Sequence, residues 1–217
     1  MKMINKHLLP IILAAVLIGC NSRPSKQEGG DIVYTAEPDQ EVKLFEEQAY
    51  KDSVLLAVTK EVLSTIKDKE YSKLAAYFHP KEGVRFSPYG YIDTLHHVHF
   101  TVTEFLEQAR DDQPIVWGSY DGKGTDIHLS LDTYFDRFVY DVDFLQAEQT
   151  RVNEILGKGN SLINIRQVYP GTDFTESYFS GFEEKYGGMD WRSLRLVFKP
   201  IEGAPRLVAI VHDEWTI

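Results

Sequence analysis

Apolar residues recur with a helical period in the first part of the chain. Between Val42 and Ile66 they return every three or four residues, and the stripe they form consists of Leu55, Val58, Val62 and Ile66. This spacing places them on one face of a long amphipathic helix. A shorter helix is expected from Tyr71 to Phe78, with Leu74 and Phe78 on one side. It should end there, because His79 precedes Pro80 and the residue before a proline avoids the helical conformation.

Farther along the chain, apolar and polar residues alternate, which is the period of a β-strand. Two helices are expected among the strands, since Thr101 with Glu104 forms a capping box and Ser130 is an N-cap residue. The last two strands flank a turn rich in proline and glycine and predict a hairpin. The strands are expected at residues 84–86, 115–120, 127–129, 140–145, 161–169, 174–179, 192–198 and 207–211.

This order of elements predicts the fold class. Helices come first and an antiparallel hairpin closes the chain, so we expect one α+β domain over residues 42–217. In this domain the N-terminal helices pack on a curved antiparallel sheet. No internal repeat and no second break in composition divides this part of the chain.

The first twenty residues have the pattern of an export signal. Basic residues precede an apolar run from Leu8 to Ile18, which as a helix would rise only about 16 Å and would cross about half of a membrane's hydrocarbon core. Leu17-Ile18-Gly19-Cys20 then resembles the bacterial lipoprotein signal, in which the cysteine is lipidated and becomes the mature N-terminus. The alternative is an ordinary signal peptide with an incidental cysteine.

The lipoprotein interpretation divides the N-terminal region. Residues 1–19 would be the signal peptide, and residues 20–41, rich in Pro, Gly, Ser and charge, would be a flexible tether carrying the lipid on Cys20. Acyl chains on Cys20 would hold the protein on a membrane of the bacterial cell envelope. Asn21 after the cysteine, rather than Asp, favours the outer membrane by analogy with enteric bacteria.

Composition narrows the classes of partner. The formal net charge is -10, from 23 basic and 33 acidic residues, which disfavours nucleic acid as a partner. A single cysteine excludes an internal disulfide and zinc sites that need several cysteines. The sequence has no phosphate-binding loop, no dinucleotide fingerprint and no nucleophile elbow, so we expect no cofactor.

Residues 55–86 resemble a known superfamily. The segment LLAVTKEVLSTIKDKEYSKLAAYFHPKEGVRF is similar to the opening of nuclear transport factor 2-like domains, also called cystatin-like cones, and LRLVFKPIEGAPRLVAIVHDEWTI is similar to their closing hairpin. This resemblance implies a pocket between the concave sheet face and the N-terminal helices, and sheets that often pair into a homodimer. The segment between Asp93 and Phe144 is longer than the simplest members need.

The whole chain is also similar to uncharacterised bacterial lipoproteins. The similarity lies in RFSPYGYID, YDVDF, GNSL and YGGMDWRSLRLVF. It implies an envelope location and no activity.

Two segments contain residues that could bind a metal ion. His97 and His99 would share one face of a strand, with His96 on the other and Asp93 as a further ligand. Residues 121–126, DGKGTD, have part of a calcium-loop pattern. Solvated histidines and a hairpin turn explain both segments more simply, and we expect no metal site.

Acidic residues and one histidine are the candidates for catalysis. Asp141 and Asp143 would share one strand face, where burial would raise one pKa, and His212 stands near the end of the last strand. These three are the candidate catalytic residues of a cofactor-free isomerase or dehydratase, a class implied by the resemblance. The simpler interpretation leaves both carboxylates in water.

A binding domain is the function class that we prefer. It would hold a small molecule, a glycan or an envelope protein in an aromatic-lined pocket. The competing interpretation makes Asp190, Arg192 and Asp213 a structural ion-pair set, with the tryptophans as packing. The candidate binding residues are Arg85, Tyr89, Trp117, Tyr120, Trp191, Arg192 and Asp213.

Overall fold

A computed structural model describes residues 38–216. The predicted signal peptide, Cys20 and most of the predicted tether lie outside the described residues. Helix α1 already begins at Pro38, within the segment expected to be the end of the tether. The helices are α1 Pro38–Lys67, α2 Tyr71–Ala75, α3 Val102–Asp111, α4 Leu131–Phe138 and α5 Ile165–Val168, with 3₁₀ turns η1 Phe144–Gln146 and η2 Glu184–Tyr186.

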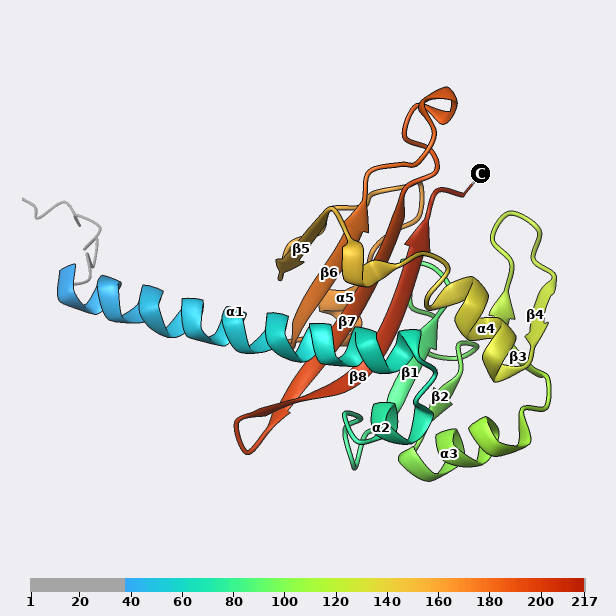
Figure 1. Cartoon of the computed structure of the whole chain (residues 1–217), viewed down its shortest axis with the longest axis horizontal. Coiled ribbons are helices and arrows are strands. Elements are labelled where there is room, and N and C mark those ends of the chain that lie inside the picture. The colour runs from blue at the N-terminus through green and yellow to red at the C-terminus, as the bar shows by residue number, and fades with distance from the viewer. Residues whose placement is uncertain (1–37, 217) are drawn as a thin grey trace, which may run out of the picture. The chain divides into compact units, whose positions relative to one another are not determined.

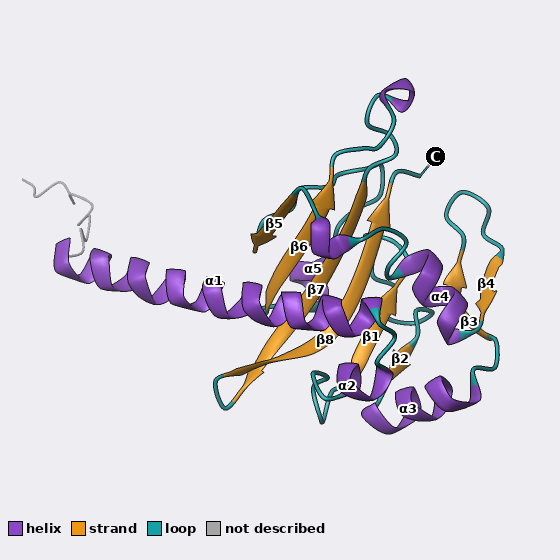
Figure 2. Cartoon of the chain, in the orientation of Figure 1, coloured by secondary structure: helices purple, strands orange, loops and turns teal. Residues whose placement is uncertain are grey.

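The strands form one large sheet and a separate hairpin (Figure 2). The order of strands in the large sheet is β2-β1-β8-β7-β6-β5, and β3 pairs only with β4. Neighbours are antiparallel except β1 and β8, which are parallel, so the expectation of a fully antiparallel sheet was wrong at this pair. The strands are β1 Val84–Ser87, β2 His99–Phe100, β3 Ile115–Ser119, β4 Asp126–Leu129, β5 Gln149–Val152, β6 Asp173–Phe179, β7 Arg192–Ile201 and β8 Ala204–Glu214.

Helix α1 lies across one face of the large sheet, here called the helix face (Figure 1). Its buried residues begin at Leu55, and Val62 and Ile66 pack with Leu196 of β7 in one core. The Thr59 hydroxyl lies 2.8 Å from that of Thr175 on β6, which adds a polar contact within this layer. The α+β domain with N-terminal helices on a curved, mostly antiparallel sheet is therefore confirmed.

The N-terminal half of α1 extends beyond the sheet. Residues 40–51 are exposed, including Val42, Leu44 and Phe45. None of the described helices is both long and apolar enough to span a membrane.

The opposite face of the sheet, here called the loop face, has its own small core. Val197, Ala209 and Val211 point to this side and pack against Ile92 and Ile165. The segment 153–163 and α5 cover this face next to the core. The loop face is where most of the polar groups described below lie.

An aromatic core joins the β3–β4 hairpin to α3 and α4. Trp117 was expected to bind a ligand, but it is completely buried. Its ring stacks on Tyr134 at 3.8 Å, and its indole N–H donates to the Leu129 carbonyl. A fully buried tryptophan whose ring is stacked and whose donor is occupied is a packing residue.

The predicted N-caps of two helices are confirmed, whereas two of the expected strands are wrong. The Thr101–Glu104 capping box closes both of its hydrogen bonds, and Ser130 caps α4. Residues 140–145 form a turn and η1 instead of a strand, because Tyr140 N–H closes onto Phe135 after α4. Residues 161–169 contain α5, and the Asn164 side chain pairs with both backbone groups of Ile92 in place of strand pairing.

Candidate functional site

A polar, aromatic-lined hollow opens where three loops meet, and we call it the tyrosine pocket. Its volume is about 420 Å³, and its walls come from the segment after β1, the β3–β4 turn and Ser161. Tyr89 and Tyr120, both predicted as binding residues, line it. Its other main lining residues are Tyr91, His97 and Asp121.

His97 presents a neutral imidazole in this pocket. The backbone N–H of Asp93 donates to its Nδ1 at 3.1 Å, and since an N–H can only donate, the ring proton lies on Nε2. Burial lowers the pKa of His97 to about 4, so the ring is uncharged at neutral pH. No described residue accepts a hydrogen bond from Nε2, which leaves one donor for a ligand.

The two carboxylates of the tyrosine pocket are already paired. Asp93 Oδ2 lies 2.7 Å from His96 Nδ1, and its Oδ1 accepts backbone N–H groups. Asp121 accepts from its neighbour Gly122 and from the hydroxyls of Ser161 and Thr216. The pocket therefore combines aromatic rings, hydroxyls and a neutral donor, with its acidic charge taken up by internal contacts.

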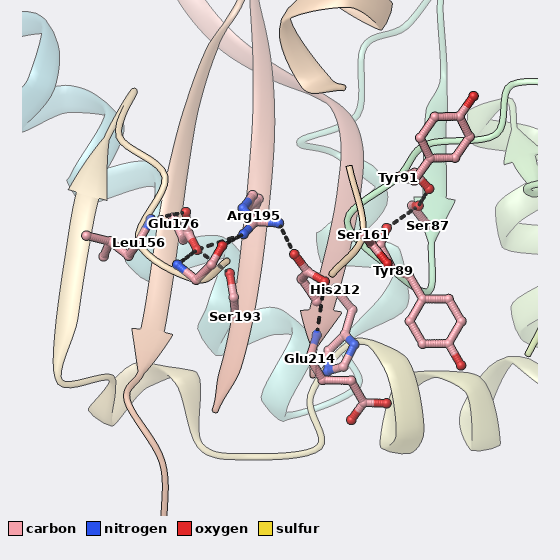
Figure 3. Close-up of polar contacts among 12 residues, drawn as sticks. Ser87, Tyr89, Tyr91, Leu156, Ser161, Glu176, Ser193, Arg195, His212 and Glu214 are labelled. Atoms are coloured by element: carbon pink, nitrogen blue, oxygen red, sulfur yellow. Dashed lines mark hydrogen bonds and ion pairs between the residues drawn. The ribbon is translucent and has the colours of Figure 1, made fainter. Parts of the chain in front are cut away.

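A buried ionic triad lies on the loop face beneath the 153–163 segment (Figure 3). Arg195 has no exposed surface, and it contacts Glu176 at 3.0 Å and Asp213 at 2.8 Å. Burial raises the pKa of Asp213 and the ion pair with Arg195 opposes this effect. Asp213 pairs with Arg195 and not with Arg192, so the predicted ion-pair set of Asp190, Arg192 and Asp213 was wrong at Asp213.

The triad holds the covering loop by its backbone. Glu176 accepts the N–H groups of Leu156 and Gly157, each at 2.9 Å, and Arg195 donates to the Gly157 carbonyl at 2.8 Å. A side chain at Gly157 would meet the Trp191 ring at 2.6 Å, so glycine is required for this close approach. Trp191, a predicted binding residue, is thus a packing residue of this loop.

A second charged cluster lies at the end of β8 on the helix face. Asp141 Oδ1 lies 3.2 Å from His212 Nε2, and its Oδ2 lies 2.6 Å from Arg192. Glu214 pairs with Arg137 at 2.5 Å and with Arg192 at 3.3 Å. The structure thus brings together two of the candidate catalytic residues, Asp141 and His212.

The histidine of this cluster is shielded from solvent. His212 has no exposed surface, and both its ring nitrogens face acceptors, namely Asp141 and the Pro88 carbonyl at 3.2 Å. Asp141, His212 and Glu214 place donor atoms within 4.8 Å of one another, which is metal-ligand spacing. The guanidinium groups of Arg137 and Arg192 already give Glu214 and Asp141 their positively charged partners, in the place that a metal ion would take.

The remaining candidates are dispersed. Asp143 lies on the surface, paired with Lys67, and does not share a face with Asp141. Arg85 donates to the His97 carbonyl on the loop face. His99 contacts the Glu82 carbonyl, so the three histidines do not converge on one point.

Lowering the pH is expected to weaken the ion pairs of this cluster, because it protonates Asp141. Although burial raises its pKa, the hydrogen bond and charge of His212 and the charge of Arg192 hold the pKa of Asp141 below its usual value. The stabilisation is thus present above about pH 4 and is lost as the pH falls through the folded-state pKa. We expect Asp141→Asn to lower the free energy of unfolding at neutral pH and to have less effect near pH 3, as urea unfolding would measure. An equal effect at both pH values would contradict this assignment.

The comparisons with known proteins identify no family. No model of a protein family matches the chain, and no curated protein sequence does. Among solved structures, that of Aln2 from a Streptomyces species aligns with 82% of this chain and 93% of its own, at 12% sequence identity and a TM-score of 0.31. A similarity at this level carries no argument about fold family or function.

Proposed function

We propose that the protein is a non-catalytic binding domain for a neutral, hydroxyl-rich ligand of the glycan type, with the tyrosine pocket as its binding site. The observation that carries the proposal is the set of three tyrosine rings and one neutral imidazole donor, in a pocket whose two carboxylates are already hydrogen-bonded within the protein. Aromatic faces contact the C–H faces of sugar rings, and hydroxyls and a neutral imidazole satisfy sugar hydroxyls. A pocket of this composition has no unpaired cation to select an anionic ligand.

The size of the tyrosine pocket and the exposure of one of its tyrosine rings agree with a glycan ligand. A volume of about 420 Å³ lies in the range of small-ligand sites. Tyr89 is nearly buried, and its ring packs edge-on against Phe138, whereas half of the Tyr91 surface is exposed. Tyr89 thus forms a fixed floor, and Tyr91 is the ring most available to a ligand.

The lipid anchor belongs to the same proposal. A domain held by Cys20 on an envelope membrane would meet envelope glycans at high local concentration. The enzyme alternative has less support, because His212 has no exposed surface through which it could contact a substrate.

Tyr91→Ala is the variant that tests the pocket. We expect it to weaken binding of N-acetylglucosamine or glucose to the full-length protein about tenfold, since loss of an aromatic contact costs about 1.4 kcal/mol. Isothermal titration calorimetry would measure the change. Tyr186→Ala is the matched control, because Tyr186 is similarly exposed but lies on η2, outside this pocket. Binding of neither sugar to the unmodified protein would refute the proposed function.

A further inference from the structure

A second hollow lies directly beside the tyrosine pocket on the loop face. It has a volume of about 380 Å³, and Ser161 lines both hollows. Its walls include Ile155, Ile163 and Phe174. The two hollows therefore share Ser161 as part of their walls.

The second hollow has a different chemistry from the first. Its floor is apolar, and Leu162 projects at its rim with 77% of its surface exposed. Arg166 lies over the Phe174 ring at 5.0 Å, and its guanidinium donates to the Thr172 carbonyl and to the Asn153 side chain. That guanidinium is consequently held in place and adds a flat wall. Such a hollow suits a group that carries methyl or acyl carbons.

The wall between the hollows is fixed at several points. The Ser161 hydroxyl donates to Asp121 at 3.3 Å, and the Asn160 amide donates to the Thr216 carbonyl at 3.2 Å. On the other side, the triad holds the backbone at Gly157. A wall anchored at both ends keeps the two hollows at a constant separation, as two subsites for one ligand require.

We infer that the two hollows form one groove for a linear glycan of at least two units, in which an acylated sugar occupies the second hollow. The first unit lies against the tyrosines, the chain crosses Ser161, and the acyl group of the next unit contacts Ile163, Leu162 and Phe174. This inference rests on the proposed function, because it takes the tyrosine pocket as the first subsite. It adds the length and the substituent of the ligand.

Two matched series of oligosaccharides test the inference on the full-length protein. One is β-1,4-linked N-acetylglucosamine and the other β-1,4-linked glucose, each of one to four units, so that the series differ only in the acetamido group. We expect the Kd to fall about tenfold from one unit to two in the acetylated series, and less in the glucose series. Equal affinity for one and two acetylated units, or an equal gain in both series, would overturn the inference.

Leu162→Ala separates the two subsites. We expect this variant to lose most of the gain from the second acetylated unit and to bind the monosaccharide unchanged. Leu44→Ala, a similarly exposed leucine on α1, should keep the gain. If Leu162→Ala keeps it too, the second hollow is not the subsite. If no sugar of either series binds, the proposed function itself fails, which is distinct from monosaccharide binding without a gain with length.

Discussion

Replacing Arg195 by methionine is expected to lower the free energy of unfolding by about 3–5 kcal/mol, the usual cost of removing one partner from a buried ion pair. Glu176 and Asp213 would remain buried and lose their shared cation. Because a domain has only about 5–15 kcal/mol of stability, this is a large fraction of the total. Denaturant unfolding at neutral pH would measure it, together with a fall in Tm of about 10 °C.

The matched control is the exposed ion pair of Lys199 with Glu82. Lys199→Met should cost less than about 1 kcal/mol, since solvent screens this pair. The Arg195→Met deficit should shrink as the pH falls, because buried carboxyls without a cation have raised pKa values and become neutral. A deficit no larger than that of Lys199→Met would show that the triad contributes little to stability.

The second large effect concerns Cys20. Replacing it by serine is expected to abolish incorporation of a fatty-acid label into the protein, because a hydroxyl cannot replace the thiol that accepts the lipid. Without acyl chains the protein should also leave the detergent phase in phase partitioning. Labelled cells followed by isolation of the protein would give the measurement.

Ser22→Ala, a substitution in the adjacent predicted tether, is the control and should keep the label. The label is the decisive readout, since an uncleaved apolar leader could itself keep the serine variant at the membrane. A label that persists in Cys20→Ser, or is absent from the unmodified protein, would refute the lipoprotein prediction.

Local signals in the sequence were enough to place most helices and the closing hairpin. The α1 stripe, the Thr101 cap and the alternation of β7 each depend on neighbours within a few residues. The parallel pairing of β1 with β8 joins Arg85 to Ala209, and no local pattern encodes a contact over that separation. β5 was missed because Gln149–Val152 has no clear alternation.

The site could be predicted only in part for a similar reason. Tyr89 and Tyr120 were among the candidates, but the role of His97 depends on a backbone N–H donating to its Nδ1, which a sequence does not show. Arg195 carried a usable signal, since it is a charged residue between Leu194 and Leu196 in the apolar part of a strand. Glu176 carried less, because its neighbours Thr175 and Ser177 are polar. A charge in such a position is buried only when it is paired, so the sequence could have predicted a buried acidic partner for Arg195, although not which residue it is.

The place of β8 in the sheet also bears on how the chain is made. This strand lies between β1 and β7, and it is the last of the described strands to be synthesised. Until residues 204–214 emerge from the ribosome, β1 and β2 have no connection to the rest of the sheet. The large sheet therefore cannot be complete before β8 has been synthesised, and its folding depends on contacts between segments that lie far apart in the sequence.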